Sequence, residues 1–306
     1  MSQEEENLRE DYAIRAAQYY ETGDFVRAEH QARRGLALDN EHGILNLILG
    51  RTLLKKRNLT SVAASRRPLE KAHKTIHSHR TAYSLGEFHL RYGEFLRGEA
   101  GVLRATADEL PTEEKFEQAD LYRRAKKLEG KAAEHLTTSL DFINTALSEQ
   151  PDWIFALQHK ASILAHQKEN KKALTTVDHL CQVLGKSRKH KNEQLLLQEL
   201  SVSQENRLRR DLFTDIEWEL AARGLASTIL MNQKTWESAE AHLTQMLSLA
   251  PDMVTEYYNR GLCLHHMGRI QEAAADMRIF LGKTDLAMDT AEVDRALAIM
   301  TKVRIP

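Results

Sequence analysis

The sequence has few of the residues that interrupt helices or build sheets. Only five Pro and fourteen Gly occur in 306 residues, and aromatic residues make up 6% of the chain. No segment shows the alternation of β-branched and polar residues that predicts strands. Long stretches of Ala, Leu, Glu, Gln, Lys and Arg, which favour helices, are present instead. The composition therefore predicts an all-α protein with essentially no strand.

Cysteines and long apolar runs are also scarce. The two cysteines, Cys181 and Cys263, lie far apart in the sequence and form no Cys-x-x-Cys pair, which indicates a reduced, intracellular protein. No apolar run approaches the roughly 18 residues that a membrane-spanning helix needs. The N-terminal Met-Ser-Gln-Glu-Glu-Glu is acidic, whereas a secretory signal is basic and then apolar. We therefore expect a cytoplasmic protein, unless an export signal precedes these residues.

Neither sign of charge dominates the chain. It carries 43 Lys and Arg against 44 Asp and Glu, a formal net charge of −1, so overall charge predicts neither a nucleic-acid binder nor a membrane-surface protein. The length exceeds that of one ordinary compact core, which leaves either two globular domains or an extended stack of repeats. The helix-rich composition favours the stack.

Two adjacent blocks of 34 residues, 220–253 and 254–287, repeat the same pattern. Each has a small residue near its first third, a Leu three positions later, an Ala after a central turn and a bulky apolar residue four positions further on. These residues are Ser227, Leu230, Ala239 and Leu243 in the first block and Gly261, Leu264, Ala273 and Met277 in the second. The period and the pattern resemble the tetratricopeptide repeat. The resemblance implies an all-α right-handed solenoid of stacked helix-turn-helix repeats, a fold that serves the binding of other polypeptides.

Further blocks begin at 9, 43 and 154. The block at 43 matches the repeat only in its first helix, because Pro68 predicts a second helix that is split or delayed until Leu69. Residues 77–137 show helical patterns without the repeat signature, and the stretch 112–149 reads as one long helix or two end to end. A basic loop is expected at 185–191, then a helix from 192 to about 212, so that 188–219 form one degenerate unit.

These blocks predict six regions along the chain. An apolar end face of a solenoid needs a cover, so we expect the last helix to be a cap. The predicted regions are a disordered N-terminus at 1–8, an N-terminal repeat pair at 9–76, an irregular helical spacer at 77–137, central repeats at 138–219, a regular repeat pair at 220–287 and a capping helix at 288–306.

The resemblance also implies where a partner binds. In the family, ligands lie on the inner face of the superhelix, which the first helix of each repeat lines. The largely apolar and aromatic lining suits a peptide or an amphipathic helix of a partner protein; the alternative is that these side chains only pack against neighbouring helices. The predicted peptide-groove residues are Tyr20, Phe155, Gln158, Thr228, Met231, Tyr258, Leu262 and His265.

A second candidate surface is basic. Residues 51–80 carry nine Lys or Arg and one acid, Glu70, a local charge of +8. Such a segment can hold nucleic acid or another anionic surface, with help from 186–191, or it can simply be a solvated helix face. No Phe, Tyr or Trp lies between the charges, which weighs against single-stranded RNA. The predicted basic-patch residues are Lys55, Lys56, Arg57, Arg66, Arg67, Lys71, Lys74 and Arg80.

Signals for chemistry are weaker. Glu70, His73 and His77 share one helical face and form a candidate metal site, although the surrounding positive charge opposes a divalent cation. The sequence shows no nucleophile elbow, no phosphate loop and no paired catalytic carboxylates. We therefore expect a non-enzymatic scaffold or adaptor without catalytic residues, metal or cofactor. The adaptor for an anionic surface is the alternative, and a metal-dependent enzyme at the Glu70 face is less favoured.

Overall fold

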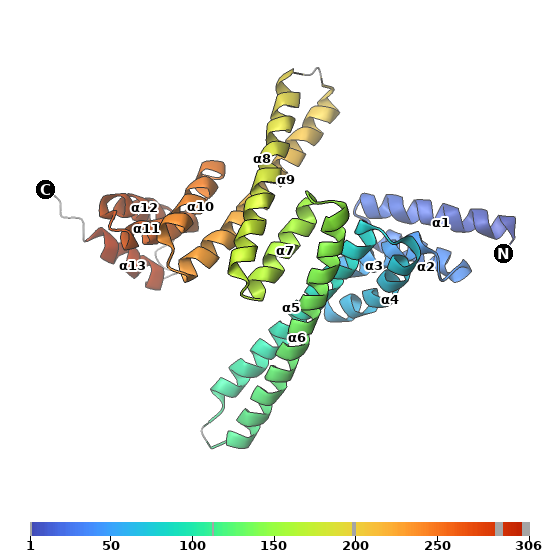
Figure 1. Ribbon diagram of the computed structural model, residues 1–306, viewed down its shortest axis with the longest axis horizontal. Helices are drawn as coiled ribbons and strands as arrows, with labels where there is room; N and C mark the ends of the chain where they lie inside the picture. The colour runs from blue at the N-terminus through green and yellow to red at the C-terminus, as the bar shows by residue number, and fades with distance from the viewer. Residues whose placement is uncertain (1, 112, 198–199, 285–289, 302–306) are drawn as a thin grey trace. The chain divides into compact units, whose positions relative to one another are not determined.

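The fold comes from a computed structural model, which describes residues 2–111, 113–197, 200–284 and 290–301. Every regular element in these ranges is a helix (Figure 1), which confirms the all-α prediction. None of the helices in the described ranges combines the length and hydropathy that crossing a bilayer requires. The chain divides into two compact units, Met1–Ile163 (unit 1) and Leu164–Pro306 (unit 2).

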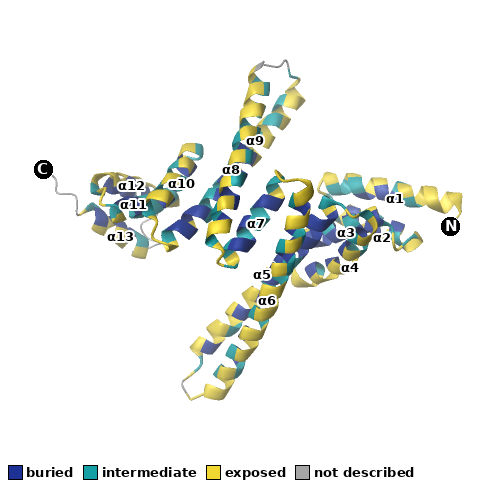
Figure 2. Ribbon diagram, viewed as in Figure 1, coloured by how far each residue is buried: buried dark blue, intermediate teal, exposed yellow. Residues whose placement is uncertain are grey.

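Unit 1 begins with two helical pairs, followed by a long hairpin. Its core joins small and branched side chains such as Ala16, Ala28, Leu45 and Leu49, all at most 5% exposed. Figure 2 colours the buried residues of these helices dark blue and the exposed ones yellow. The helices are α1 (Gln3–Glu21), α2 (Phe25–Leu38), α3 (Gly43–Lys55), α4 (Leu59–Ile76), α5 (His79–Glu109), α6 (Lys115–Glu149) and α7 (Ile154–His166), the last of which extends into unit 2.

Unit 2 begins with a long hairpin and continues into two regular helical pairs. All eight repeat residues that the sequence identifies in 220–287 are buried. The close approach of paired helices explains Gly261, because a Cβ there would lie 2.7 Å from Met277 Cε. The helices are α8 (Asn170–Leu197), α9 (Val202–Asn232), α10 (Trp236–Leu249), α11 (Val254–His266), α12 (Ile270–Lys283) and α13 (Thr290–Met300).

A residue with a left-handed backbone marks the turn inside five of the repeats. Its φ angle lies between 53° and 80° in each case, a conformation that Gly adopts readily and other residues rarely do. Each such residue lies fourteen positions after the start of a block at 9, 43, 154, 220 or 254, so the five blocks share one register. In chain order these residues are Gly23, Arg57, Lys168, Lys234 and Gly268.

One prediction at the N-terminus is wrong. The segment 1–8 is not disordered along its length, because α1 begins at Gln3. The Ser2 side chain accepts a hydrogen bond from the Glu5 backbone N–H, and the Glu5 carboxylate accepts one from the Ser2 backbone N–H. Such a capping box satisfies N–H groups that the start of a helix leaves unpaired.

The second helix of the block at 43 is neither split nor delayed. Helix α4 runs unbroken through Pro68, whose missing N–H leaves the carbonyl of Ala64 without its helical partner. Ala64 is exposed, so water can bind that carbonyl. Leu69 is fully buried in a cluster with Leu54 and Phe88, and this packing holds the helix together across the proline.

The irregular spacer at 77–137 is most of a long antiparallel hairpin. Helices α5 and α6 lie side by side over their length (Figure 1), and α6 is a single helix of 35 residues. They approach closely at Gly86, where a Cβ would lie 2.8 Å from Ile143 Cδ1, and the Ser139 hydroxyl donates to the Gly86 carbonyl over 2.7 Å.

Two histidines face each other across this hairpin. Nδ1 of His89 lies 2.9 Å from Nδ1 of His135, so one ring must donate and the other accept. The His89 ring stacks on Phe142. Burial, with a contribution from His135, lowers the pKa of His89 to about 4, and burial likewise lowers the pKa of His135. The environment of the hairpin core therefore favours the neutral form of both imidazole rings.

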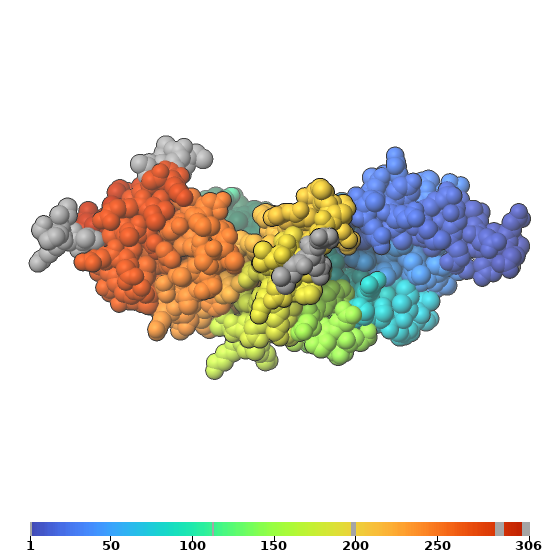
Figure 3. Space-filling view, turned by 90° about the horizontal axis from the view of Figure 1, so that it is seen from above, coloured from blue at the N-terminus to red at the C-terminus, as the bar shows by residue number. Residues whose placement is uncertain are grey.

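The basic loop expected at 185–191 and the separate helix from 192 are also wrong. Helix α8 continues to Leu197, and α9 begins at Val202, so the two form a second hairpin, whose described residues are mostly yellow in Figure 3. Lys191 Nζ lies 2.6 Å from Asp215 Oδ2, and Arg188 pairs with Glu219. Both acids are at most 5% exposed. These ion pairs anchor the basic run to α9 as a helix.

The predicted capping helix is α13. Its described residues Val293, Ala296 and Ile299 are at most 8% exposed and pack into a cluster with Leu264 and Phe280. Helix α13 thus covers the apolar face of the last repeat. Residues 288–289 and 302–306 of the predicted cap lie outside the described residues.

Candidate functional site

A pocket in unit 2 gathers three of the predicted groove residues. It has a volume of about 510 Å³ and lies among the end of α9, the start of α10, the C-terminal half of α11 and helix α13. Met231, Leu262 and His265 are the predicted residues that line it. Its other lining residues are Asn232, Trp236, His266, Arg295, Ala298 and Ile299.

Aromatic stacking shapes one wall of this unit 2 pocket. The rings of Trp236 and His266 are stacked with centroids 4.1 Å apart and an interplanar angle of 9°. Ile299 is 3% exposed and therefore belongs to the pocket floor. Arg295 forms no ion pair with a described residue and lies at 3.5 Å from the Tyr258 hydroxyl. The pocket thus combines an apolar interior with one cation whose charge the described residues leave unpaired.

The two remaining unit 2 predictions lie elsewhere. Tyr258 is only 4% exposed and packs against Phe280 in the core, with ring centroids 5.1 Å apart, so its ring is not available to a partner. Thr228 is exposed but outside the pocket, and its hydroxyl donates to the Gly224 carbonyl. The groove pattern alone does not distinguish these positions from Met231 and Leu262.

The other three predicted groove residues belong to unit 1. Tyr20 contacts Phe25 edge to face, and the Arg51 guanidinium lies 4.8 Å from its ring centroid. Phe155 is 46% exposed. The side-chain carbonyl of Gln158 is buried and has no hydrogen-bond partner among the described residues.

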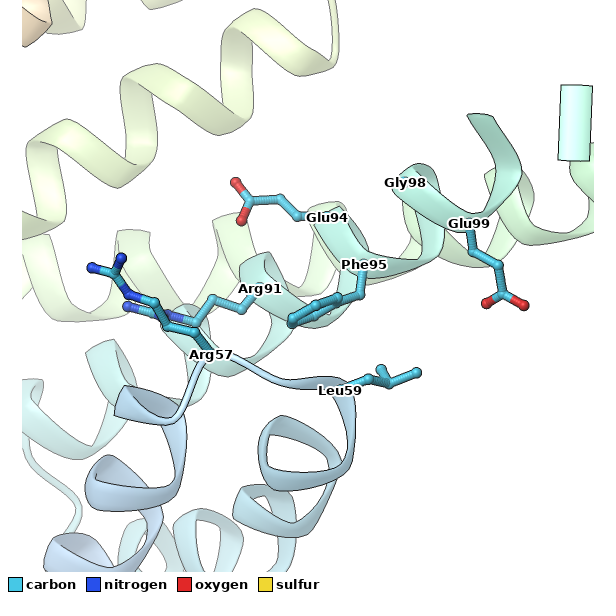
Figure 4. A pocket seen from close by; sticks show the side chains of 7 residues that line it. All are labelled: Arg57, Leu59, Arg91, Glu94, Phe95, Gly98 and Glu99. Atoms are coloured by element: carbon cyan, nitrogen blue, oxygen red, sulfur yellow. The ribbon is translucent and has the colours of Figure 1, made fainter. Parts of the chain in front are cut away.

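A further pocket of unit 1 has walls of mixed charge (Figure 4). Its volume is about 590 Å³, and it lies between the α3–α4 turn and α5. In Figure 4 the side chains of Arg57 and Arg91 point to the same side of the pocket, away from Glu99. Phe95 and Leu59 supply its apolar surface. Gly98 and Glu94 complete the lining.

The predicted basic patch is partly neutralised by neighbouring acids. Lys56 pairs with Glu29 at 2.6 Å, Lys71 with Glu41 at 2.7 Å, and Arg66 with Glu70 at 2.7 Å. The remaining members form no ion pair with a described residue. They are Lys55, Arg57, Arg67, Lys74 and Arg80.

The structure does not assemble the candidate metal site. Glu70 is engaged by Arg66, and Nδ1 of His73 lies 3.0 Å from the Thr81 hydroxyl. Across the described ranges, no group of three or more His, Cys, Asp or Glu side chains is arranged to hold a metal ion.

The cysteines offer no activated nucleophile. Burial raises the pKa of the Cys181 and Cys263 thiols to about 11, so both remain protonated near neutral pH. A protonated thiol is a poor nucleophile.

Sequence reasoning missed the contributions of α10 and α13 to the unit 2 pocket. Trp236 lies on α10 and Ile299 on α13, whereas the groove was predicted only from the first helix of each repeat. The spacing of Arg295, Ala298 and Ile299 is that of one helix face, and this signal could have joined the capping helix to the site.

Comparison with known proteins agrees with this architecture. Residues 227–301, which include the unit 2 pocket, match the family model described as tetratricopeptide repeat. We found no match among curated proteins.

The solved structures that are similar to this chain include two tetratricopeptide repeat proteins. One is a thermophilic tetratricopeptide repeat protein of Thermus thermophilus, at 14% identity and a TM-score of 0.44, covering 84% of this chain and 98% of that one. The other is a tetratricopeptide repeat protein of Parabacteroides merdae, at 13% identity and a TM-score of 0.39, covering 96% and 99%.

Proposed function

Because residues 227–301 match the tetratricopeptide repeat, we propose that this chain is a non-enzymatic adaptor whose unit 2 pocket binds a peptide or helix of a partner protein. Proteins of this family typically act as scaffolds for protein–protein interaction. The adaptor holds its partner by shape and burial and performs no reaction on it. Its specificity follows from the side chains that line the pocket.

The observation that carries the proposal is the composition of the pocket wall. Met231, Trp236, Leu262 and Ile299 form an apolar interior within about 510 Å³. A concave site with an apolar lining and a few polar groups is the usual form of a ligand pocket. Burying about 100 Å² of a partner's apolar surface there would contribute roughly 2.5 kcal/mol before ordering costs.

The lining also indicates the chemistry of the occupant. A bulky aliphatic or aromatic side chain fills an apolar pocket of this size, and the Trp236–His266 stack offers it a flat wall. Arg295 lines the same pocket without an ion pair to a described residue. An acidic residue beside the apolar anchor would pair with it, since guanidinium and carboxylate bind in a matched geometry. We therefore expect an apolar anchor flanked by an acid.

Peptide display against the full chain tests this proposal. Selection should enrich peptides with a bulky apolar residue and a neighbouring acid, and Met231→Glu or Leu262→Glu should weaken the best peptide by about tenfold or more, because each places a charge in an apolar site. Leu297→Glu is the matched control, since Leu297 lies on α13 and is 48% exposed but does not line the pocket.

All three variants should retain helical circular dichroism and a cooperative thermal transition. Equal binding by Met231→Glu, Leu262→Glu and the wild-type chain would show that this pocket is not the binding site. A loss shared equally by Leu297→Glu would lead to the same conclusion.

A second candidate function rests on the unpaired members of the basic patch. Arg67 and Lys74 lie exposed on α4 without an ion pair to a described residue, and together with Lys55 they could hold nucleic acid or another anionic surface. The run 186–191 adds less than expected, because Arg188 and Lys191 are bound to buried acids. If the patch binds nucleic acid, affinity should fall steeply with salt and be lost on Arg67→Glu with Lys74→Glu. Binding that is insensitive to both changes removes this candidate.

A further inference from the structure

A second, smaller pocket of unit 1 lies at the start of α5. Its volume is about 250 Å³, below the range of roughly 300–1,000 Å³ that sites for larger ligands occupy. It is therefore sized for one compact chemical group. Its lining residues come from α3, from the first turns of α5 and from the α6–α7 turn: Arg51, His79, Arg80, Tyr83, Gln150 and Trp153.

The two arginines of this pocket lack acidic partners. Neither Arg51 nor Arg80 forms an ion pair with a described residue, and no carboxylate is among the described lining residues. Nε of Arg51 is buried and has no acceptor among the described residues. Glu87, whose negative charge helps to raise the pKa of Tyr83, forms an ion pair with Arg91 at 2.7 Å. The pocket therefore keeps two permanent positive charges that the described part of the chain does not neutralise.

The N-terminus of α5 adds to this positive field. His79 and Arg80 are the first two residues of a helix of 31 residues, and the start of a helix carries partial positive charge. One oxyanion is already bound there, because the His79 backbone N–H donates to the Glu149 carboxylate over 2.9 Å. The same carboxylate lies 3.3 Å from His79 Nδ1, so Nδ1 is the donor of that ring and Nε2 of the neutral imidazole is an acceptor.

Aromatic rings fix the walls. Trp153 lies with its ring centroid 4.6 Å from that of Tyr83 and 5.2 Å from that of His79. Tyr83 also stacks on His159 at 5.3 Å. Side chains held in this way lose little freedom when a ligand enters, so their donors are set in place before binding.

The number and type of hydrogen-bond donors in this pocket indicate which ligand it can bind. Burial raises the pKa of Tyr83 above its usual range, so its hydroxyl stays protonated and can donate. The side chains of Tyr83 and Gln150 make no hydrogen bond with a described residue. With the two guanidinium groups, four side chains can donate to one small group. A carboxylate has two oxygens, whereas a phosphate monoester has three exposed oxygens and up to two charges.

We propose that the pocket lined by Arg51, Arg80, Tyr83 and Trp153 binds a phosphate monoester, presented by a phosphorylated side chain of a partner protein. Arginine forks bind phosphate oxygens in pairs, and Gln150 and Tyr83 supply neutral donors to the remaining oxygen. This site does not depend on the unit 2 pocket, which the proposed function concerns.

Titration of the full chain with inorganic phosphate tests the pocket itself. The indole N–H signal of Trp153, assigned by its loss in Trp153→Phe, should shift and saturate. A phosphoserine peptide should bind more tightly than its unphosphorylated form in calorimetry. Arg51→Gln and Arg80→Gln should each weaken phosphate binding by about tenfold, since each removes charge-assisted hydrogen bonds.

Arg97→Gln is the matched control, because Arg97 is an exposed α5 arginine without an ion pair to a described residue and lies outside both the pocket and the basic patch. It should change phosphate affinity by less than about twofold, as a distant screened charge does. Arg80 is also exposed, so Arg80→Gln keeps the test valid even if Arg51→Gln fails to fold.

Three outcomes overturn the proposal: no shift of the Trp153 signal at saturating phosphate, equal losses in Arg97→Gln and Arg80→Gln, or binding to anionic lipid vesicles without binding to phosphate or phosphopeptide. Met231→Glu in unit 2 should leave phosphate binding unchanged. If the proposed function is wrong, Met231→Glu will bind the apolar peptide as well as the wild-type chain does. If the phosphate site is wrong, only the phosphate titration will fail.

Discussion

The regular repeats of unit 2 and the α5–α6 hairpin of unit 1 solve the same packing problem in different ways. In the repeats, short helices of 13 and 14 residues cross at a small residue, Gly261, and a flexible Met277 fills the space beside it. In the hairpin, helices of 31 and 35 residues lie along each other through Gly86, Ser139 and a histidine pair. Repeats thus concentrate their constraints at a few periodic positions, while the hairpin distributes polar and apolar contacts along its length.

The largest expected effect is common to both regions. Leu243 in the repeats and Ile143 in the hairpin are both fully buried, so truncation to Ala should cost each about 3 kcal/mol of unfolding free energy, from lost burial and the cavity left behind. Urea unfolding measures both. A cost below about 1 kcal/mol at Ile143 would show that the hairpin is loosely packed, unlike the repeats.

Acid should separate the two regions. Because burial lowers the pKa of His89 to about 4 and also lowers the pKa of His135, the unfolded chain binds protons on these rings at a higher pH than the folded chain. Their contribution to stability is complete above the ordinary histidine pKa of about 6.5 and declines as pH falls toward 4. We expect a loss of roughly 1–2 kcal/mol, reduced by partial exposure.

Hydrogen exchange at pH 7 and pH 5 locates this acid effect. Protection should fall at pH 5 in the α5 and α6 peptides of the wild-type chain, and Phe in place of His89 should remove most of that difference. An unchanged difference in His89→Phe would assign the acid sensitivity to other groups.

Glycine substitutions sharpen the contrast further. Ala at Gly86 meets Ile143 at 2.8 Å and the Ser139 carbonyl at 3.3 Å, so Gly86→Ala should destabilise by about 1–2 kcal/mol. Gly98 lies on the same helix with no neighbour within 4 Å among the described atoms, and Gly98→Ala should stabilise by about 0.5–1 kcal/mol through helix propensity. Thermal unfolding of the two variants tests this, and a shift of the same sign in both would argue against close packing at Gly86.

The smallest effect concerns the repeat turns. Lys168 and Lys234 have φ angles of 61° and 59°, where the corresponding turns of the first and last repeats use Gly. Lys234→Gly should therefore raise stability by up to about 1 kcal/mol by relieving the left-handed strain. Lys234→Ala, which keeps the strain, is the control. A stabilisation by Ala equal to that by Gly would mean that lost charge, and not backbone geometry, is responsible.

The repeats were predictable because their constraints are periodic. Ser227, Leu230, Gly261 and Leu264 recur at fixed intervals, and the structure buries all of them. The same logic fails at Pro68, where a local breaker is overridden by the burial of Leu69. Tertiary packing outweighs local propensity there.

The hairpins and the sites depend on contacts between distant segments. The basic run at 185–191 becomes helical because Asp215 and Glu219 lie beside it on α9, which no local pattern indicates. Likewise, the sequence predicts Met231 and Leu262 as groove residues. That Ile299 of α13 lines the same pocket is known only from the structure. Tyr258 shows the converse, since a helical position alone does not tell a groove residue from a core residue.

One measurement tests the central claim most directly. A display-selected peptide carrying a photoreactive apolar residue at its anchor position is crosslinked to the full chain, and the attachment points are read by mass spectrometry. The account predicts crosslinks at Met231, Trp236, Leu262 and the Ala298–Ile299 segment, with loss in Leu262→Glu and retention in Leu297→Glu. Crosslinks confined to the exposed face of α4, or spread over the surface without preference, would contradict it.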